Sequence, residues 1–312
     1  MKNRAFVRYN AKGEIVPGSL IVTGGTKPQG PAVWKEVSVD LNYPPSFTLA
    51  HATDFHLKNN AVCNARLPLF KAALTKSNPD VIFATGDMID AQGGNADQVT
   101  LLGTLLTDLN KIAPTYVARG NHDPALTNEQ LTMSANYYYV DIQKWRFIVL
   151  FSQQAAYEDA GSTYTINSDW RFGATQLTWL ADTIDSTPND MSVCVISHVP
   201  ILGVGSMMWW ITYYSANPVT NLSWNPTVDQ MKDVFAVTEI FRTRPKVKLC
   251  LSGHEHIYSE EEYLGVKYVN SGAVCANWWN DSSYQEKHHP AGYRLIKFFN
   301  DGTFSVGKML TY

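Results

Sequence analysis

Short apolar runs alternate with longer amphipathic stretches through most of this chain. The apolar runs at 47–53, 81–85 and 115–118 have the length and composition of buried strands. Between them, apolar residues recur at helical spacing around 67–74 and again at 102–113. This β-α-β-α-β order predicts a largely parallel, buried sheet.

The second half of the chain continues the alternation and then becomes richer in strands. We expect two strands within 137–152, a helix at 177–184, a strand at 193–197, a helix at 231–241 and a strand at 247–252. Three later runs, at 267–270, 293–299 and 303–309, have the pattern of β hairpins, with Asn300-Asp301-Gly302 as a tight turn. The chain is therefore expected to be an α/β protein with a strand-rich C-terminal part.

Residues 1–44 differ from the rest because glycine and proline interrupt two short β-like runs, at 19–23 and 33–39. Pro44-Pro45 marks the boundary. We expect a β-rich extension, 1–44, that packs on a main domain, 45–312. Residues 199–228 contain no Asp, Glu, Lys or Arg and are rich in aromatic side chains, which predicts an aromatic insertion in the main domain.

Composition excludes several classes of protein. Of 312 residues, 45% are apolar and 17% are charged, which is enough apolar material for a buried core and too little charge for a disordered chain. The net charge of -3 disfavours a dedicated nucleic-acid surface. Four cysteines without a CxxC pair do not form a disulfide framework.

The sequence contains neither the apolar stretch of a signal peptide nor a transmembrane stretch, so as numbered it predicts a cytoplasmic protein. An exported protein whose signal had been removed would have the same sequence pattern.

Polar residues suited to metal binding follow five predicted strands directly. The five segments are Asp54-Phe-His56, Gly86-Asp87-Met-Ile-Asp90, Gly120-Asn121-His122-Asp123, Ser197-His198 and Gly253-His254-Glu-His256. Because ligands bind at the carboxyl edge of such sheets, these segments should converge in space. In Asp54-x-His56 and His254-x-His256, both outer side chains would point the same way if the stretch stays extended.

Two aspartates, one asparagine and four histidines form a mixed oxygen and imidazole donor set, which suits Zn, Fe or Mn. These are too many donors for one tetrahedral ion. They suit two ions that share a bridging carboxylate and leave positions open for water and substrate. The glycines before Asp87, Asn121 and His254 permit sharp turns where the strands end.

The ordered set DFH, GDMID, GNHD, SHVP and GHEH resembles the calcineurin-like metallophosphoesterase superfamily. The resemblance spans residues 54–256 and implies a β-sandwich flanked by helices, in α/β/β/α layers. It implies a first metal site formed by Asp54, His56, Asp87 and His256. It implies a second metal site formed by Asp87, Asn121, His198 and His254, with Asp87 as the bridge.

The same resemblance places His122 outside the metal ligands and beside the substrate, so the predicted catalytic residues are Asn121, His122 and Asp123. Asp123 is either a loop carboxylate or a group that orients His122. Arg119 either touches a phosphate or forms a salt bridge. Asp90 and Glu255 are expected to be structural or supporting, and His51, His288 and His289 match no motif position.

Two aromatic clusters follow the metal-ligand strands, and loops in such places often build binding sites. They are Trp209, Trp210, Tyr213 and Tyr214 after His198, and Trp278 and Trp279 after the GHEH segment. One interpretation is a wall of the substrate pocket, which could stack on a ring or cover an apolar leaving group. Core packing and a homodimer surface are the alternatives.

The sequence therefore predicts a hydrolase of phosphoric monoesters or diesters, with a small phosphorylated substrate. A hydroxide activated by two transition-metal ions would attack phosphorus in line, and His122 would stabilise or protonate the leaving oxygen. The alternatives are a catalytically weak metal-binding scaffold of the same fold and a nuclease. An eroded ligand set would favour the scaffold and basic patches would favour the nuclease.

Overall fold

A computed structural model describes residues 4–9, 21–23, 33–37, 46–91, 95–160, 170–204, 231–279 and 289–312 of the chain. The chain forms two compact units, Met1–Pro44 and Pro45–Tyr312. The first contains a three-stranded antiparallel sheet in the order β2-β1-β3, with β1 at Arg4–Tyr9, β2 at Ile21–Thr23 and β3 at Val33–Val37. Packing of this unit on the main domain stays a prediction.

The second unit contains two mixed sheets. The five-stranded sheet has the order β14-β13-β4-β5-β6. Its strands are β4 (Phe47–Ala52), β5 (Val81–Ala84), β6 (Thr115–Val117), β13 (Gly292–Phe298) and β14 (Phe304–Thr311). The strands β4, β5 and β6 run parallel, as their β-α-β-α-β order predicted, whereas the β13–β14 hairpin joins β4 in antiparallel fashion.

The six-stranded sheet has the order β11-β12-β10-β9-β8-β7. Its strands are β7 (Tyr138–Ile142), β8 (Trp145–Leu150), β9 (Ser192–Ser197), β10 (Val247–Ser252), β11 (Ser259–Tyr263) and β12 (Val266–Asn270). Its four central strands are parallel and both edge strands are antiparallel. The five strands that carry the metal-type motifs are therefore divided between two sheets, as the β-sandwich implied by the resemblance requires, whereas the β-α-β-α-β pattern by itself indicated one.

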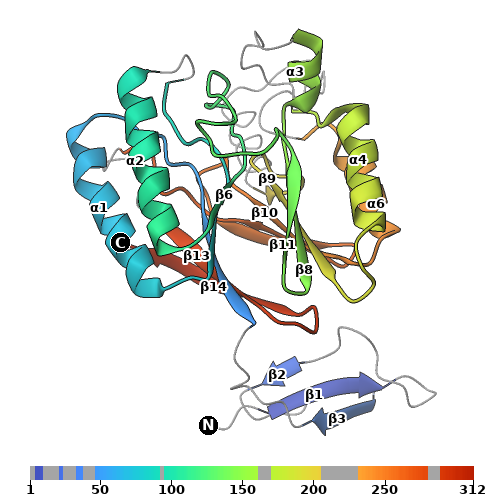
Figure 1. Cartoon of the computed structure of the whole chain (residues 1–312). Helices are drawn as coiled ribbons and strands as arrows, with labels where there is room; N and C mark the ends of the chain where they lie inside the picture. The colour runs from blue at the N-terminus through green and yellow to red at the C-terminus, as the bar shows by residue number, and fades with distance from the viewer. Residues whose placement is uncertain are drawn as a thin grey trace, which may run out of the picture. The chain divides into compact units, whose positions relative to one another are not determined.

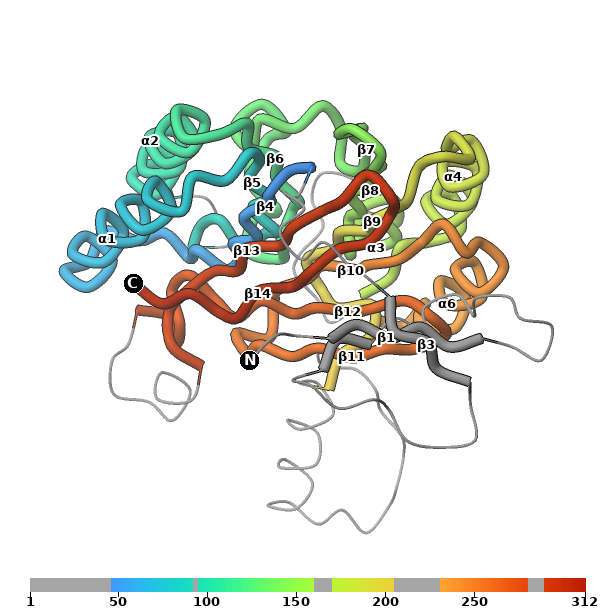
Figure 2. The backbone as a smooth tube through the Cα atoms, turned by 90° about the horizontal axis from the view of Figure 1, so that it is seen from below, coloured from blue at the N-terminus to red at the C-terminus, as the bar shows by residue number. Residues whose placement is uncertain are grey.

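Helices cover the outer faces of both sheets (Figure 1). The helices are α1 (Ala61–Ser77), α2 (Ala96–Ile112), α3 (Gln154–Ala160), α4 (Gly173–Asp185) and α6 (Val234–Arg242). Apolar residues of α1 and α2 pack on the five-stranded sheet, and those of α4 and α6 pack on the six-stranded sheet. Figure 2 shows the two sheets between these helix pairs, in the α/β/β/α layers that the resemblance implied. Among the described residues, none of the helices combines the length and hydropathy needed to span a bilayer.

A third apolar layer lies between the two sheets and holds them face to face. Phe83 of β5 stacks on Phe147 of β8 with ring centroids 5.0 Å apart, and Phe147 also meets Phe298 of β13 edge to face. All three rings are fully buried, so this contact fixes one sheet against the other. The sandwich thereby brings the carboxyl ends of strands from both sheets to one place.

Candidate metal centre

The segment after β4 carries the first two predicted ligands and is paired with the segment after β5. The amide of Asp54 donates to the Gly86 carbonyl at 3.1 Å, and the amide of His56 donates to the Asp87 carbonyl at 2.8 Å. Asp54 and His56 both have left-handed backbone, with φ of 55° and 40°. The stretch is therefore not extended, so the condition under which alternation would point both side chains the same way is not met, and the backbone turns at each ligand instead.

Left-handed backbone is a general property of this site. Five of the seven predicted ligands have positive φ: Asp54, His56, Asp87, His254 and His256. For a residue with a Cβ this conformation costs about 1–2 kcal/mol, and it persists only where the surrounding structure imposes it. Such strain concentrates at functional sites, so the accumulation here marks the centre independently of the motif match.

Close approach explains two of the predicted glycines. A Cβ at Gly120 would lie 2.1 Å from the amide nitrogen of Asp87, and a Cβ at Gly253 would lie 1.8 Å from Thr53 Oγ1. Neither distance can be accommodated by an ordinary side chain. These glycines let the strand-end turns approach one another, so the ligands they carry can converge.

One group of donor atoms comes from both sheets. The Nε2 atoms of His56 and His256 lie 2.9 Å apart. Asp87 Oδ2 lies 3.5 Å from His56 Nε2, and Asp54 Oδ1 lies 3.5 Å from His256 Nε2. These four side chains are the ones that the resemblance assigned to the first metal site.

A second group adjoins the first through Asp87. Its Oδ1 atom lies 3.3 Å from His198 Nε2. Asn121 Oδ1 lies 3.0 Å from His198 Nε2 and 2.9 Å from His254 Nδ1. Asp87 thus presents one oxygen to each group, as a bridging carboxylate would.

Hydrogen bonds behind the rings determine which nitrogen faces the centre. His198 Nδ1 donates to the Thr85 carbonyl at 2.8 Å, and His256 Nδ1 donates to the Ala276 carbonyl at 2.7 Å. A carbonyl can only accept, so in the neutral ring each Nε2 presents a lone pair. Around His198, that lone pair meets the acceptor oxygens of Asn121 and Asp87, an arrangement that only a proton or a metal ion makes favourable.

The pKa values of Asp54 and His198 also indicate that positive charge stabilises this centre. Burial alone would raise the pKa of Asp54, but the charge and hydrogen bond of His256 lower it to about 2. Burial would lower the pKa of His198, but the charge and hydrogen bond of Asp87 raise it to about 9. Burial likewise opposes ionisation of Asp87, but the charge and hydrogen bond of His198 hold the pKa of this carboxyl well below its usual range. Asp54 and Asp87 are therefore both anionic and buried, and this donor set suits resident cations.

His122 lies beside the first group, within reach of His56 and Asp87. Its backbone amide donates to Asp87 Oδ1 at 2.7 Å, and its Nδ1 donates to the Asp90 carbonyl at 2.8 Å. The His122 and His56 rings meet edge to face, with centroids 4.7 Å apart. The imidazole is thus held at the edge of the centre with its Nδ1 already bonded.

Asp123 binds backbone amides of two strand-end turns. Its Oδ1 accepts from Met88 at 2.9 Å and Ile89 at 3.3 Å, and its Oδ2 accepts from Gly120 at 2.9 Å. Burial and the charge of Asp87 raise the pKa of Asp123 to about 6, against the opposing effect of the Gly120 amide. Its place is therefore to hold the turns that carry the ligands, which agrees with the first of the two alternatives expected from the sequence, a loop carboxylate, and not with an orienting contact to His122.

The guanidinium of Arg119 is in a different place from the one that the sequence suggested. It is buried and donates to the carbonyls of Asp123 and Leu126, at 2.6 and 2.7 Å, and to Asn128 Oδ1 at 2.8 Å. Through these three bonds Arg119 stabilises the loop after the GNHD turn.

The two supporting acidic residues lie outside the donor groups. Asp90 Oδ1 lies 3.9 Å from His56 Nδ1, behind the ring, and 3.6 Å from Lys58 Nζ. Glu255 accepts a hydrogen bond from Asn270 Nδ2 at 2.9 Å. Both positions agree with the supporting roles expected from the sequence.

The two neighbouring tryptophans of the second aromatic cluster have different places. Trp279 is 2% exposed, and its indole N–H donates to the carbonyls of Phe55 and His56, so it packs behind the centre and does not line a pocket. Trp278 is 38% exposed and contacts the histidines of the centre. The other predicted wall residues lie outside the described residues: Trp209, Trp210, Tyr213 and Tyr214.

Sequence reasoning assigned no function to His51, which is a buried histidine that connects the two sheets near the centre. His51 Nε2 lies 2.9 Å from Thr85 Oγ1, and its Nδ1 lies 2.5 Å from Ser271 Oγ. Thr85 in turn accepts from His198 through its carbonyl. No motif contains His51, and its position three residues before Asp54 was the only available signal.

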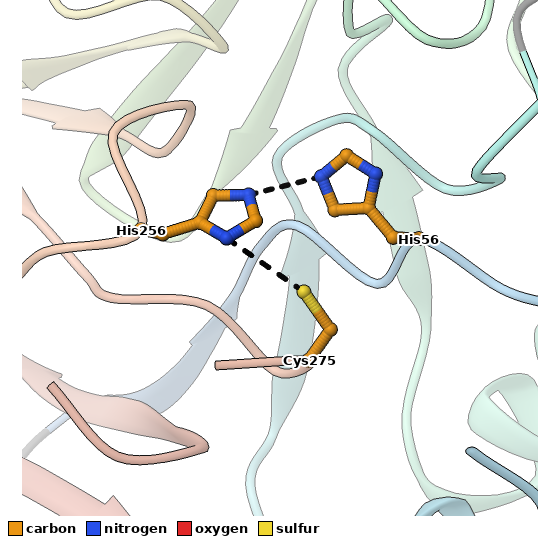
Figure 3. A group of neighbouring side chains, drawn as sticks. All are labelled: His56, His256 and Cys275. Atoms are coloured by element: carbon orange, nitrogen blue, oxygen red, sulfur yellow. Dashed lines mark hydrogen bonds between the residues drawn. The ribbon is translucent and has the colours of Figure 1, made fainter. Parts of the chain in front are cut away.

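A buried cysteine was also missed. Cys275 Sγ lies 3.8 Å from His256 Nδ1, on the side of the ring opposite the nitrogen that faces His56 (Figure 3). The thiol therefore packs behind a predicted ligand and does not take part in the converging set of Nε2 and oxygen atoms.

Comparison with known proteins agrees with this geometry. The family model described as calcineurin-like phosphoesterase matches residues 47–258, which include all seven predicted ligands. No curated protein matches the chain.

Several solved structures share the fold at low sequence identity. A dimetal phosphatase from Danio rerio superposes with a TM-score of 0.59 at 13% identity, over 82% of this chain and 94% of that one. A purple acid phosphatase from yellow lupin gives 0.53 at 14% identity, over 98% and 67%. The anchor in the inner membrane complex of Plasmodium gives 0.54 at 13%, over 85% and 84%. The fold is thus common to proteins with differing described roles, and function must be argued from the site.

Proposed function

The chain belongs to the calcineurin-like phosphoesterase family, and we propose that it hydrolyses phosphoric esters at a dinuclear metal centre formed by its strand-end side chains. The observation that carries the proposal is the pair of four-donor groups that share Asp87. One oxygen of Asp87 lies 3.5 Å from His56 Nε2 and the other lies 3.3 Å from His198 Nε2. A bridging carboxylate between two mixed oxygen and imidazole sets is the usual arrangement of two-metal hydrolases.

Mn, Fe or Zn suits these donors, with one ion in each group. When bound, two such ions would lower the pKa of a water molecule and withdraw charge from the phosphoryl oxygens. The chain's own contribution is to hold the donors in place before substrate arrives. The carbonyls of Thr85 and Ala276 orient His198 and His256, and the strained turns fix the carboxylates.

His122 is the residue we assign to the leaving group. Its Nδ1 proton is committed to the Asp90 carbonyl, so Nε2 is the ring atom that can hold a second proton. In its protonated form, His122 would donate from Nε2 to the leaving oxygen as the P–O bond breaks. Asn121, whose amide oxygen faces two histidines, would hold its metal ion without adding negative charge beside the phosphate.

A scaffold of the same fold without catalysis is the second candidate. The similarity of an anchor protein shows that the fold alone does not decide between the two. The intact donor set favours the hydrolase, because burying carboxylates and lone pairs without a bound metal ion would lower the stability of the fold. A nuclease is less favoured, because the net charge of -3 offers no excess of cations to a polynucleotide.

The test is hydrolysis by protein purified without chelator and reconstituted with Mn, Fe or Zn. Bis-p-nitrophenyl phosphate and p-nitrophenyl phosphate distinguish diester from monoester activity, and nucleotides and phospholipid headgroups follow as natural substrates. We expect turnover of at least one p-nitrophenyl ester. Metal-loaded protein that hydrolyses none of these esters would leave the scaffold as the better description.

The control is the Asp87→Asn protein, which keeps the size of the side chain and removes the bridging charge. We expect turnover to fall strongly in this variant, because two ions lose the negative charge between them. Turnover equal to that of the wild-type preparation would come from a contaminating phosphatase.

A further inference from the structure

The indole of Trp278 lies against three histidines of the centre. Its ring centroid is 3.8 Å from that of His56 and 5.0 Å from that of His122. It is stacked on His256, with centroids 5.2 Å apart and planes 28° from parallel. Trp278 therefore borders both the first donor group and the histidine that we assign to the leaving group.

The backbone that presents this indole is strained and firmly attached. Ala276, Trp278 and Trp279 all have left-handed φ, of 52°, 55° and 61°. A tryptophan adopts this conformation only where its surroundings impose it. The amide of Cys275 donates to the Asp54 carbonyl at 3.1 Å, and the Trp279 indole donates to the carbonyls of Phe55 and His56. The turn is thus tied to the segment that carries two ligands.

Core packing does not account for the position of Trp278. The neighbouring Trp279 is 2% exposed and fills the space behind the centre, whereas Trp278 remains 38% exposed. Its indole is an apolar aromatic ring that contacts histidines of the centre, at a position that solvent can reach. The backbone of Trp278 is strained, and the indole remains accessible beside the proposed metal centre. This combination indicates that Trp278 contacts a ligand of the site.

We propose that Trp278 determines substrate specificity by stacking on a flat aromatic group of the phosphoric ester, such as a nucleobase or an aryl alcohol. This inference rests on the proposed function and deepens it by naming a class of substrate. Indole faces stack on aromatic rings in offset or edge-on geometry, and a ring joined to the phosphoryl oxygen near His122 would reach the indole. Alkyl esters of the same charge would gain no such contact.

The test measures binding of two ligands that cannot be hydrolysed and that differ only in the ring. These are phenylphosphonate and methylphosphonate, titrated into metal-loaded protein by calorimetry. We expect the wild-type protein to bind phenylphosphonate about tenfold more tightly, a difference typical of stacking on one aromatic side chain. Trp278→Ala should abolish the difference and leave the methylphosphonate affinity within about twofold, whereas Trp278→Phe should keep part of it.

Two further proteins keep the result interpretable. Tyr263→Ala removes an aromatic side chain of similar exposure, 46%, from β11, and should change neither affinity. Trp278→Leu retains apolar bulk without a ring, so it should behave as Trp278→Ala does even if the smaller substitution destabilises the turn. Elemental analysis of each variant shows whether the metals are retained.

Two results would overturn the inference without touching the proposed function. One is a wild-type protein that hydrolyses esters but binds both phosphonates equally. The other is a Trp278→Leu protein that weakens both ligands to the same degree or loses metal, which would make Trp278 a support of the ligand histidines only. Failure of the wild-type protein to hydrolyse any ester would instead refute the proposed function.

Discussion

The Nε2 atoms of His56 and His256 lie 2.9 Å apart, although 200 positions separate these residues in the chain. His256 Nδ1 donates to the Ala276 carbonyl. In the neutral ring, the lone pair of His256 Nε2 therefore points at His56, which this nitrogen faces (Figure 3). Two imidazoles in this arrangement share a proton or bind a common cation.

We expect about two transition-metal ions per chain, and loss of both activity and thermal stability on chelation. Without cations, the buried carboxylates and facing lone pairs repel one another, so bound metal adds to the free energy of unfolding. At metal concentrations about 100 times the Kd of each site, loss of both ions should lower Tm by roughly 10 °C. Elemental analysis and calorimetric scans with and without chelator measure both quantities. Full activity in metal-free protein would contradict this prediction.

Asp87→Ala should be the most damaging single substitution among the predicted ligands. Its two oxygens face different donor groups, so the substitution removes a donor from both ions, whereas His254→Ala removes a donor from one. We expect less than one bound metal per chain in Asp87→Ala and about one in His254→Ala. Elemental analysis decides between these values. Equal metal content in the two variants would show that Asp87 does not bridge.

His122→Ala should lower turnover by roughly 10²–10⁴-fold and leave the metal content nearly unchanged. The loss should be smaller for esters of p-nitrophenol, which leaves without a proton, than for esters of alkyl alcohols. Steady-state kinetics on both kinds of ester measure the difference. An equal loss across leaving groups would indicate that His122 positions the phosphate, and loss of metal would make it a ligand.

Gly120→Ala should disrupt the centre, because the new Cβ would lie 2.1 Å from the amide nitrogen of Asp87. Gly103→Ala is the matched control. Gly103 lies within α2, where a Cβ would meet nothing within 4 Å, so this substitution should stabilise the protein by about 0.5–1 kcal/mol. Urea unfolding and metal content of both variants test the contrast. A Gly120→Ala protein with normal metal content would mean that the turns can move apart.

His51 should make stability depend on pH. Burial, assisted by the positive charge of Arg294, lowers its pKa from 6.5 to about 3. Between these values the unfolded chain binds a proton that the folded protein does not, so stability is complete above about pH 6.5 and falls as the pH is lowered. From about pH 8 to about pH 5.5 the loss should be about 1.4 kcal/mol.

His51→Gln provides the comparison for that slope, since glutamine can bond Thr85 and Ser271 but does not titrate in this range. Urea unfolding of both proteins at several pH values, with metal present, isolates the contribution of His51. Parallel curves for the two proteins would contradict the neutral, buried state of this histidine.

The sequence by itself determined the elements and the residue types of the centre. Apolar runs of strand length and helical spacing are local properties, so β4, β5, α1 and α2 follow from the chain near 47–113. The seven polar residues at strand ends were likewise visible, because carboxylates, amides and imidazoles placed after buried strands have few structural reasons to recur in that order.

Other features were not visible in the sequence because they depend on long-range contacts. The motif set implied a sandwich, but the local pattern does not show which strand joins which sheet, because that assignment rests on side-chain packing such as that of Phe83 on Phe147. The left-handed backbone at Asp54 and His56 arises from pairing with the segment after β5, not from local propensity, which disfavours it.

The tertiary structure also separated residues that look alike in the sequence. Trp278 and Trp279 are adjacent and identical in type, but one borders the histidines while the other bonds the backbone behind them. Arg119 precedes the GNHD turn yet turns its charge toward loop carbonyls. The direction of a side chain is set by the hydrogen bonds and packing available to it in the folded chain. The carbonyls that bind Trp279 belong to Phe55 and His56, more than 200 positions away, and those that bind Arg119 depend on how the loop after it folds back.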